Sequence, residues 1–338
     1  MIDFRYHIVS IVAVFLALGL GLLVGATALQ PTALGGLISL SQREHQQIGA
    51  ALAANRQLNR QLDSNDQWAQ ANAPQLLHGL LAGERVVMVE APGASSQVVS
   101  GVSDALAEAG ATVSGQIQIQ DKFFDVSRAT QQQLTQLAQR FTPVAVSLQG
   151  SPVAQASQAI AGAILTRDGA GQPVSGQRDS ASAALLSGFG AEGFLAVNGQ
   201  PDARATLAVV IIPDTPQSTS ISNPQSQRLV TLAQQLNLAG QGTVVTGSVD
   251  GSGPGSVIDV MRNGGRAGHL SSVDNANRTI GQIVVAQALA EQLRGVSGSY
   301  GATSSAASAA PSPAPTPSAS VQPAPGQSSR PSARAGKS

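Results

Sequence analysis

The sequence predicts an α/β protein with one N-terminal transmembrane helix, a helical stalk and a disordered C-terminal tail. Three observations support this fold class. A long uncharged apolar segment opens the chain, short β-branched runs alternate with helical patterns in its middle, and Ser, Ala, Pro and Gly dominate its end. We therefore divide the chain into an anchor (residues 1–30), a helical or coiled-coil stalk (31–80), an α/β domain (81–296) and a tail (297–338).

The anchor is long enough to cross a bilayer. Ile8 to Leu29 contains no charged residue, and these residues would extend roughly 33 Å as a helix, which covers the hydrocarbon core. The stretch is longer than the apolar core of a secretory signal peptide, so an uncleaved transmembrane helix is expected. Pro31 is expected to end this helix, because proline removes a hydrogen bond from a helix interior.

Flanking charges indicate the orientation of the anchor. Arg5 precedes the apolar segment, and the next basic residue is Arg43. The positive-inside rule therefore favours a cytoplasmic N-terminus and an extracytoplasmic α/β domain. We expect a single-pass protein of the cell membrane or cell envelope.

Small residues on the anchor indicate a helix–helix contact. Ala17, Gly21 and Gly25 lie one turn apart and would let two helices approach closely, which predicts a homo-oligomer. The alternative is that glycine is simply frequent in membrane helices.

The stalk shows a heptad-like pattern with polar members. Its seam steps by four and three residues through Ile48, Leu52, Asn55, Asn59 and Leu62. This pattern fits a short coiled coil, and it equally fits a single amphipathic helix that lies on the following domain.

The α/β domain begins with a strand–helix–strand unit. Arg85–Glu90 reads as a buried strand, Ser95 or Ser96 as a helix cap, Gly110 as the helix end, and Thr112–Ile119 as the next strand. A parallel sheet follows from this order, because a helix carries the chain back to the start of the sheet.

The same alternation continues along the chain. We expect a helix around Leu134, Leu137 and Ala138, strands at 205–212 and 243–249, and helices at 228–238 and 256–261. The last helix is expected to follow Asp274 as its N-cap, with one buried side formed by Ile280, Ile283, Ala286, Ala290 and Leu293. A Rossmann-like or flavodoxin-like sheet follows, and the sequence does not discriminate between the two.

Two glycine-rich segments partly match the patterns of phosphate-binding loops. Gly188-Phe-Gly190-Ala-Glu-Gly193 matches GxGxxG, but a helical pattern precedes it and a strand pattern follows, the reverse of a dinucleotide fingerprint. Gly251, Gly253 and Gly255 follow a strand and precede a helix. They form either an anion-binding turn or, more simply, a plain loop, since no Walker lysine is present.

The sequence lacks the other common signatures of catalysis. It has no cysteine and no GxSxG elbow, and an acid–base pair of His269 with Asp274 is a weaker interpretation than a histidine beside a helix cap. Net charge is zero, so nucleic acid is not an expected partner. We predict no enzyme, no catalytic residues and no bound cofactor.

Metal ligands are also dispersed along the chain. The histidines and methionines are His7, His45, His78, His269, Met1, Met88 and Met261. Soft-metal carriers concentrate such side chains, so no metal site is assigned.

Several segments resemble a known family. They are Asp3–Ser10, Val86–Ala94, Ser272–Asn275, Ala288–Gly295 and Tyr300-Gly301, and their order is similar to that of the actinobacterial copper transporters of the MctB type. The resemblance covers roughly residues 1–301. It implies an envelope protein of copper homeostasis, a pore-forming efflux component with copper as the transported ion. A non-catalytic scaffold of the envelope, with other envelope proteins as partners, is the alternative.

Overall fold

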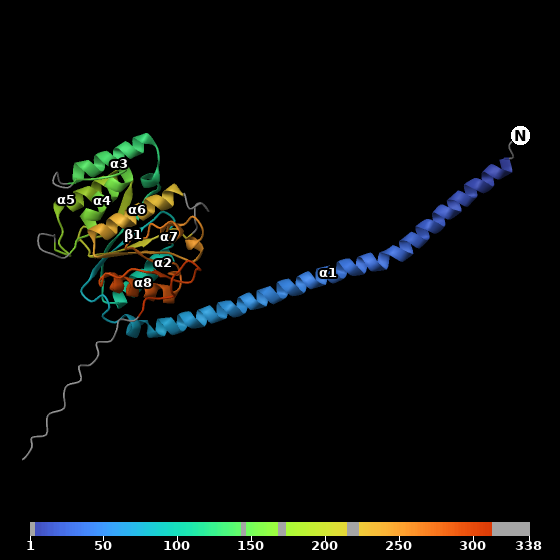
Figure 1. Cartoon of the computed structure of the whole chain (residues 1–338), viewed down its shortest axis with the longest axis horizontal. Coiled ribbons are helices and arrows are strands. Elements are labelled where there is room, and N and C mark those ends of the chain that lie inside the picture. Colours follow the sequence, from blue (N-terminus) through green and yellow to red (C-terminus); the bar gives the residue numbers. More distant parts are fainter. Residues whose placement is uncertain (1–3, 143–146, 168–173, 215–222, 313–338) are drawn as a thin grey trace, which may run out of the picture. The chain divides into compact units, whose positions relative to one another are not determined.

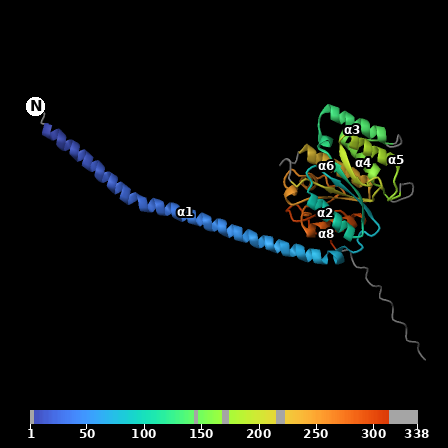
Figure 2. The same ribbon diagram turned by 180° about the vertical axis from the view of Figure 1, so that it is seen from behind.

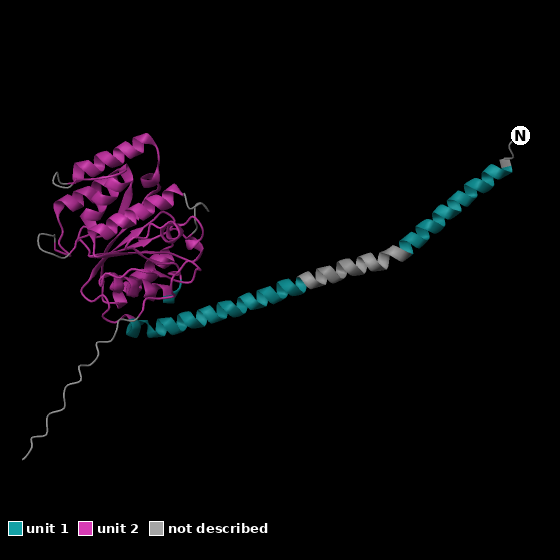
Figure 3. Cartoon of the chain, in the orientation of Figure 1, with its two compact units in different colours: residues 1–76, 278–280 teal, residues 77–277, 281–338 magenta. Residues whose placement is uncertain are grey.

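The computed structural model describes residues 4–142, 147–167, 174–214 and 223–312, with only the helical backbone at 28–44. The chain forms two compact units (Figure 3). The first comprises Met1–Leu76 with Arg278–Ile280, and the second comprises Leu77–Asn277 with Gly281–Ser338.

The first unit is built on a single helix, α1, which spans Phe4–Leu77. Its stretch Arg5–Thr27 has a mean hydropathy of 2.7 and is long and apolar enough to cross a membrane, which agrees with the predicted apolar helix. The expected helix end at Pro31 is wrong, because α1 continues through this residue. A proline inside a helix costs about 3 kcal/mol, which the many hydrogen bonds of a long helix on both sides can offset.

The stalk seam is exposed along α1. Ile48, Leu52 and Leu62 keep 58%, 53% and 45% of their surface exposed, and the Asn59 amide donates to Asn55 Oδ1 at 2.9 Å. In the same unit Arg278 forms ion pairs with two aspartates of α1, Asp63 at 3.1 Å and Asp66 at 3.0 Å. The coiled-coil interpretation of the seam stays a prediction.

The second unit is built on a seven-stranded sheet with the order β3-β2-β1-β4-β5-β6-β7. Every neighbouring pair is parallel except β2 and β3. The strand positions follow the Rossmann order 3-2-1-4-5-6, but β3 is antiparallel, and the parallel strands taken alone follow the flavodoxin-like order 2-1-3-4-5, so the sheet shares features of both predicted types. The strands are β1 Arg85–Glu90, β2 Thr112–Ile119, β3 Leu195–Gly199, β4 Leu207–Ile211, β5 Gly242–Thr246, β6 Ser271–Val273 and β7 Ser299–Tyr300.

Helices cover both faces of this sheet, as Figures 1 and 2 show from opposite sides. A mutually packed group, α3 to α7, lies on one face, and α2 and α8 lie on the other. The helices are α2 Ser96–Glu108, α3 Arg128–Phe141, α4 Pro152–Ile164, α5 Ser180–Ala191, α6 Pro224–Ala239, α7 Val257–Arg262 and α8 Thr279–Gln292, with the short 3-10 turns η1 Asp121–Phe124 and η2 Asp250–Ser252.

The central strands are apolar on both faces because both faces are covered. Val87 and Val89 pack in the core beneath α3 to α7, whereas Val86 and Met88 point to the α2 and α8 side, and all four are at most 1% exposed. Continuous apolar runs of this kind are typical of parallel sheets. The predicted parallel α/β fold is therefore confirmed, with β1 and β2 at the expected residues.

The C-terminal part of the domain differs from the prediction. Helix α8 begins at Thr279, so Asp274 as its N-cap is wrong. Ile280 is 45% exposed, while Val284, Val285 and Leu289 are buried, so the expected single apolar side of this helix is also wrong. A helix that is apolar around most of its circumference packs on more than one side.

The sheet also extends beyond residue 296, the boundary expected for the tail. Strand β7 lies at Ser299–Tyr300, and Gly301 donates its amide to the carbonyl of Ser308 at 3.1 Å. Residues 299–308 are therefore part of the domain, because their backbone groups pair with the sheet and with one another. The remainder of the predicted disordered tail, 313–338, lies outside the described residues.

Candidate functional site

The small-residue face of α1 forms a shallow open groove. It is lined by Val14, Ala17, Leu18, Gly21, Leu22, Gly25 and Ala26. A Cβ added at Gly21 or Gly25 would meet no atom within 4 Å, so the groove has room for a neighbouring helix. The contact predicted through Ala17, Gly21 and Gly25 stays a prediction.

Metal-ligating side chains do not gather in the part of the chain that the structure describes. Among those residues no three of His, Cys, Asp and Glu lie close enough to hold an ion. Met88 and Met261 are at most 1% exposed within the core, where their thioethers serve packing, and His78 and His269 are exposed. Met1 lies outside the described residues.

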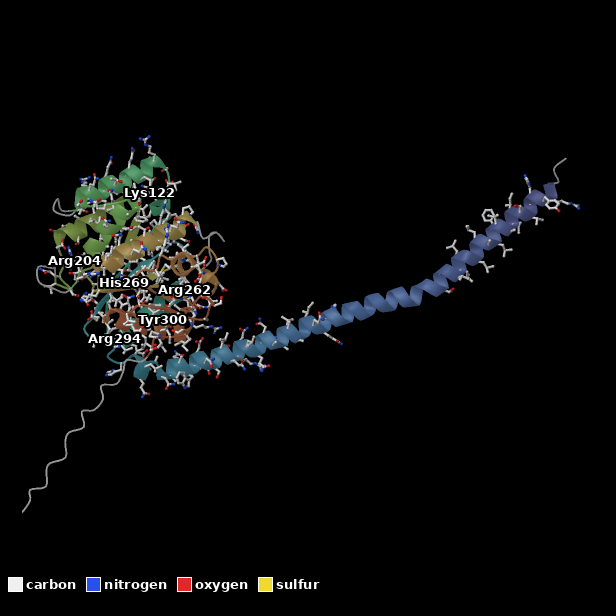
Figure 4. All side chains as sticks on the ribbon, viewed as in Figure 1. Lys122, Arg204, Arg262, His269, Arg294 and Tyr300 are labelled. Atoms are coloured by element: carbon white, nitrogen blue, oxygen red, sulfur yellow. The ribbon has the colours of Figure 1, made fainter. Side chains whose placement is uncertain are left out.

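The most developed polar cluster surrounds a buried ion pair near the carboxyl ends of β6 and β7. Arg262, at the end of α7, contacts Asp274, which follows β6, with 2.6 Å between Nη1 and Oδ2. Their side chains are only 3% and 0% exposed. Figure 4 labels Arg262 and Tyr300 in this part of the domain.

The Arg262 guanidinium is saturated with acceptors. Nε donates to Ser272 Oγ at 2.9 Å, and Nη2 donates to the carbonyls of Ser272 and Tyr300 at 3.3 and 2.8 Å. Nη1 also reaches the hydroxyls of Thr303 and Ser305. A buried charge is tolerated when its donors are satisfied in this way.

The Asp274 carboxylate is equally enclosed. Its Oδ1 accepts the amide of Ala302 at 2.6 Å, and its Oδ2 accepts the Thr303 hydroxyl. Gly301 has φ +133°, and a Cβ there would overlap Asp274 Oδ1. The chain can therefore wrap around this carboxylate only because residue 301 has no side chain.

A second buried contact holds the same strand. The Tyr300 hydroxyl donates to Glu291 Oε2 of α8, and both residues are nearly covered. Burial first, then the bond to Glu291 and its charge, raise the pKa of Tyr300. The phenol therefore stays protonated and acts as a structural donor.

This cluster joins segments that are far apart in the sequence. It places Ser272–Asn275 beside Tyr300-Gly301, two of the segments that carry the family resemblance. Sequence reasoning did not find the pair of Arg262 with Asp274. The interpretation of Asp274 as an acid–base partner of His269 is wrong, because its carboxylate is bound by Arg262 and the 302–303 segment. Within the described residues the cluster binds the 300–303 segment to the end of β6, which is a structural role.

The topological switch point lies between β1 and β4, where ligands bind in many sheets of this order. Here the loops after both strands pair with each other: Ala94 forms a bridge with Pro213, and the Asp214 amide donates to the Gly93 carbonyl at 3.2 Å. The loops thus occupy part of the space in which a dinucleotide would bind.

Glu90 is the ionisable residue at the end of β1. It is 8% exposed, its Oε2 accepts the Gln118 amide at 3.1 Å, and its Oε1 has no partner among the described residues. Burial raises the pKa of this carboxyl, and the bond from Gln118 opposes the shift only in part.

Glu90→Gln should therefore change the pH dependence of stability. The raised pKa means that the native chain holds the Glu90 proton more tightly than the unfolded chain does. The protonated carboxyl therefore contributes its full stabilisation below the ordinary carboxyl pKa of 4.5, and this stabilisation is lost as the pH rises through the folded pKa. At pH 7 the variant should unfold at a higher temperature than the native chain, and below about pH 4 this gain should vanish. Glu108→Gln, at the exposed end of α2, controls for the loss of one negative charge; an equal gain there would contradict the expectation.

Both glycine-rich segments serve the fold. Residues 188–193 end α5 and lead into β3, which confirms the helix-then-strand order that argued against nucleotide binding. A Cβ at Gly188 would overlap the Phe141 ring, so this glycine is needed for packing. In the second segment the amide of Gly251 donates to Ser248 Oγ at 3.0 Å and that of Gly255 to Asp259 Oδ2 at 2.7 Å. The chain's own groups use these amides, so a structural loop is favoured over an anion site.

The comparisons with known proteins agree with the resemblance. A family model described as "Copper transport outer membrane protein, MctB" matches residues 1–311. A protein named Copper transporter MctB from Mycobacterium tuberculosis (strain CDC 1551 / Oshkosh) is 28% identical over 302 residues, which are 87% of this chain and 94% of the relative. The protein of the same name from Mycobacterium leprae (strain TN) is 28% identical over 309 residues, 89% and 96% of the two chains.

Proposed function

Since the chain belongs to the MctB family of copper transport outer membrane proteins, we propose that it is a membrane-anchored protein of copper homeostasis that limits cellular copper. The match over residues 1–311 carries this proposal, because it includes the apolar helix, the stalk and the α/β domain together. In this proposal α1 crosses the membrane once and the α/β domain lies outside the cytoplasm. The family is named for transport, and the chain is proposed to act without catalysis.

In this proposal copper is the transported ion, and a single chain does not hold it in a metal site of its own. The described residues bring no three His, Cys, Asp or Glu side chains together, and both described methionines lie in the core. The described residues contain one helix that could cross a membrane, and one such helix cannot enclose a pore, so a transport route through these helices would need several copies of α1. The groove along Ala17, Gly21 and Gly25 supports contact between such copies.

Copper measurements in the native host test this proposal. Deleting the gene should raise cell-associated copper and lower copper tolerance, and the full chain should restore both. A chain with Gly21→Leu and Gly25→Leu should restore neither, because the larger side chains fill the groove. Gly49→Leu is the matched control, since it adds the same side chain to open space in the stalk. Unchanged copper in the deletion strain would contradict the copper role.

A second candidate function is a non-catalytic scaffold of the envelope. It is favoured by the saturated polar cluster and by the paired loops at the switch point, which leave the domain with surfaces rather than a reactive site. Crosslinking in native membranes followed by mass spectrometry discriminates the two. Capture of a defined envelope protein, with copper levels unaffected by the deletion, would favour the scaffold.

A further inference from the structure

We propose that the α/β domain pairs with a second copy of this chain through the free edge of β3 and the exposed side of α5. The proposal goes beyond copper homeostasis, because it concerns the domain's own surface and holds whatever the cargo is. It also concerns a surface other than the groove of α1.

The two edges of the sheet differ in whether other segments of the chain pair with them. At the β7 edge the chain closes the sheet itself: the amide of Ala307 donates to the Ser299 carbonyl at 2.8 Å, and Tyr300 forms a bridge with Ser308. At the other edge lies β3, with the sequence Leu-Ala-Val-Asn-Gly. This strand carries neither a charge nor a proline, the usual devices that keep an edge from pairing.

The hydrogen-bond pattern identifies which groups of β3 are free. Gln120 donates its amide to the Phe194 carbonyl and Gln200 to the Ser114 carbonyl, both at 2.9 Å, so the even-numbered residues of β3 face β2. In an antiparallel pair the alternate residues point their N–H and C=O groups away from the partner. Leu195, Val197 and Gly199 therefore direct these groups outward, and no described residue bonds to them.

A groove runs beside this edge between β3 and α5. Leu186 and Gly190 of α5 line it opposite Leu195 and Val197, and Val197 is 44% exposed. The only charged residues of its lining are Arg178 and Asp202, which neutralise each other at 2.8 Å. The groove thus offers backbone groups and apolar surface without net charge.

Helix α5 supplies a second feature of the same groove. It contains no charged residue, and Ala183, Ser187 and Ala191 form an exposed stripe one turn apart. Small residues at this spacing let two helices approach closely. A helix that is exposed on this side and bears no charge there is unusual for a surface helix, whose outer side is normally charged.

The occupant that satisfies both features is a second copy of the same chain. A two-fold axis through Val197, perpendicular to the sheet, places Val197 opposite its equivalent and Leu195 opposite the equivalent of Gly199. The outward N–H and C=O groups then pair, the two sheets become continuous, and the two α5 stripes meet on one face. Such a self-complementary contact is the commonest interface of homo-oligomers.

The absence of native cysteine allows a direct test in the full chain. In a hydrogen-bonded antiparallel pair the facing Cα atoms lie about 5.5 Å apart, which is within the range of a disulfide. Val197→Cys in native membranes treated with diamide should form a covalent dimer, on the order of tenfold more than the control, because the two thiols are held at high effective concentration. Leu238→Cys, 64% exposed at the end of α6, is the control for random collisions.

Further variants separate this interface from that of α1. The covalent dimer of the Val197→Cys chain should persist when Gly21→Leu and Gly25→Leu are added, and Ser187→Glu should abolish it by placing like charges across the axis. Val197→Pro should abolish pairing through β3 in the detergent-solubilised chain without unfolding the domain, since only an outward-facing N–H is lost. Crosslinking of Val197→Cys no greater than that of Leu238→Cys would overturn the proposal, and so would capture of a different protein by the Val197→Cys thiol.

Discussion

Arg262→Leu should lower the free energy of unfolding by about 3–5 kcal/mol, because removing one member of a buried ion pair leaves the other charge uncompensated. Asp274 is 0% exposed and would lose its charged partner, while the Ser272 and Tyr300 carbonyls would each lose one donor. The midpoint of thermal unfolding of the full chain, followed by circular dichroism, should fall by roughly 6–20 °C.

Arg178→Leu is the matched control for this prediction. It removes an ion pair of similar length, 2.8 Å to Asp202, whose arginine side chain is 57% exposed. The Asp202 side chain is only 9% exposed, but water that reaches the exposed Arg178 guanidinium can take its place beside the carboxylate, so a smaller loss than for Arg262→Leu is expected. Equal losses in the two variants would contradict this expectation, because they would show that burial of the Arg262 guanidinium adds nothing to the effect of losing the pair.

Gly301→Ala should destabilise the domain by about 2–5 kcal/mol, the combined cost of backbone strain and of a clash. The residue has φ +133°, and the added Cβ would overlap Asp274 Oδ1. That oxygen is held by the Ala302 amide at 2.6 Å and cannot move away without losing this bond. Thermal unfolding of the full chain measures the effect.

Gly295→Ala is the control that separates the cost of backbone strain from the cost of the clash. Gly295 also has a positive φ, +76°, but no atom lies within 4 Å of its added Cβ. Only the strain of about 1–2 kcal/mol should appear there. In a chain that carries Asp274→Ala, the cost of Gly301→Ala should fall towards that value, because the two changes act on one contact. If Gly301→Ala cost as much in the Asp274→Ala chain as in the native chain, the clash would involve an atom other than those of the Asp274 carboxylate.

The local elements of the fold were predictable because their signals lie within a few residues of one another. The β-branched run of β1 is read from adjacent positions, Ser95 occupies the N-cap position of α2 although its side chain makes no capping bond, and Gly110, with φ +87°, ends α2 as expected. Pro31 shows the limit of such local rules. Its effect depends on the length of helix on either side, so α1 passes through a residue that would stop a short helix.

The polar cluster was not predictable, because its members are unremarkable in their own neighbourhoods. Arg262 reads as a surface residue at the end of a short helix, and Asp274 reads as a helix cap. The pairing of β7 with β6 brings the 300–303 segment against Asp274, and this contact buries the charges of Arg262 and Asp274. The Gly301 requirement arises from the same contact, and nothing near residue 301 in the sequence indicates it.

The sequence by itself therefore determined the apolar N-terminal helix, the alternation of strands and helices and, through the resemblance of its motifs, the family. These properties depend on composition and on spacing along the chain. The tertiary structure decided the position of β1 inside the sheet and the antiparallel β3, whose outer edge no described residue pairs with. It also decided the packing of residues 299–308 against the sheet and the pairing of Arg262 with Asp274. Each of these depends on contacts between residues far apart in the sequence, whose free energy no local pattern encodes.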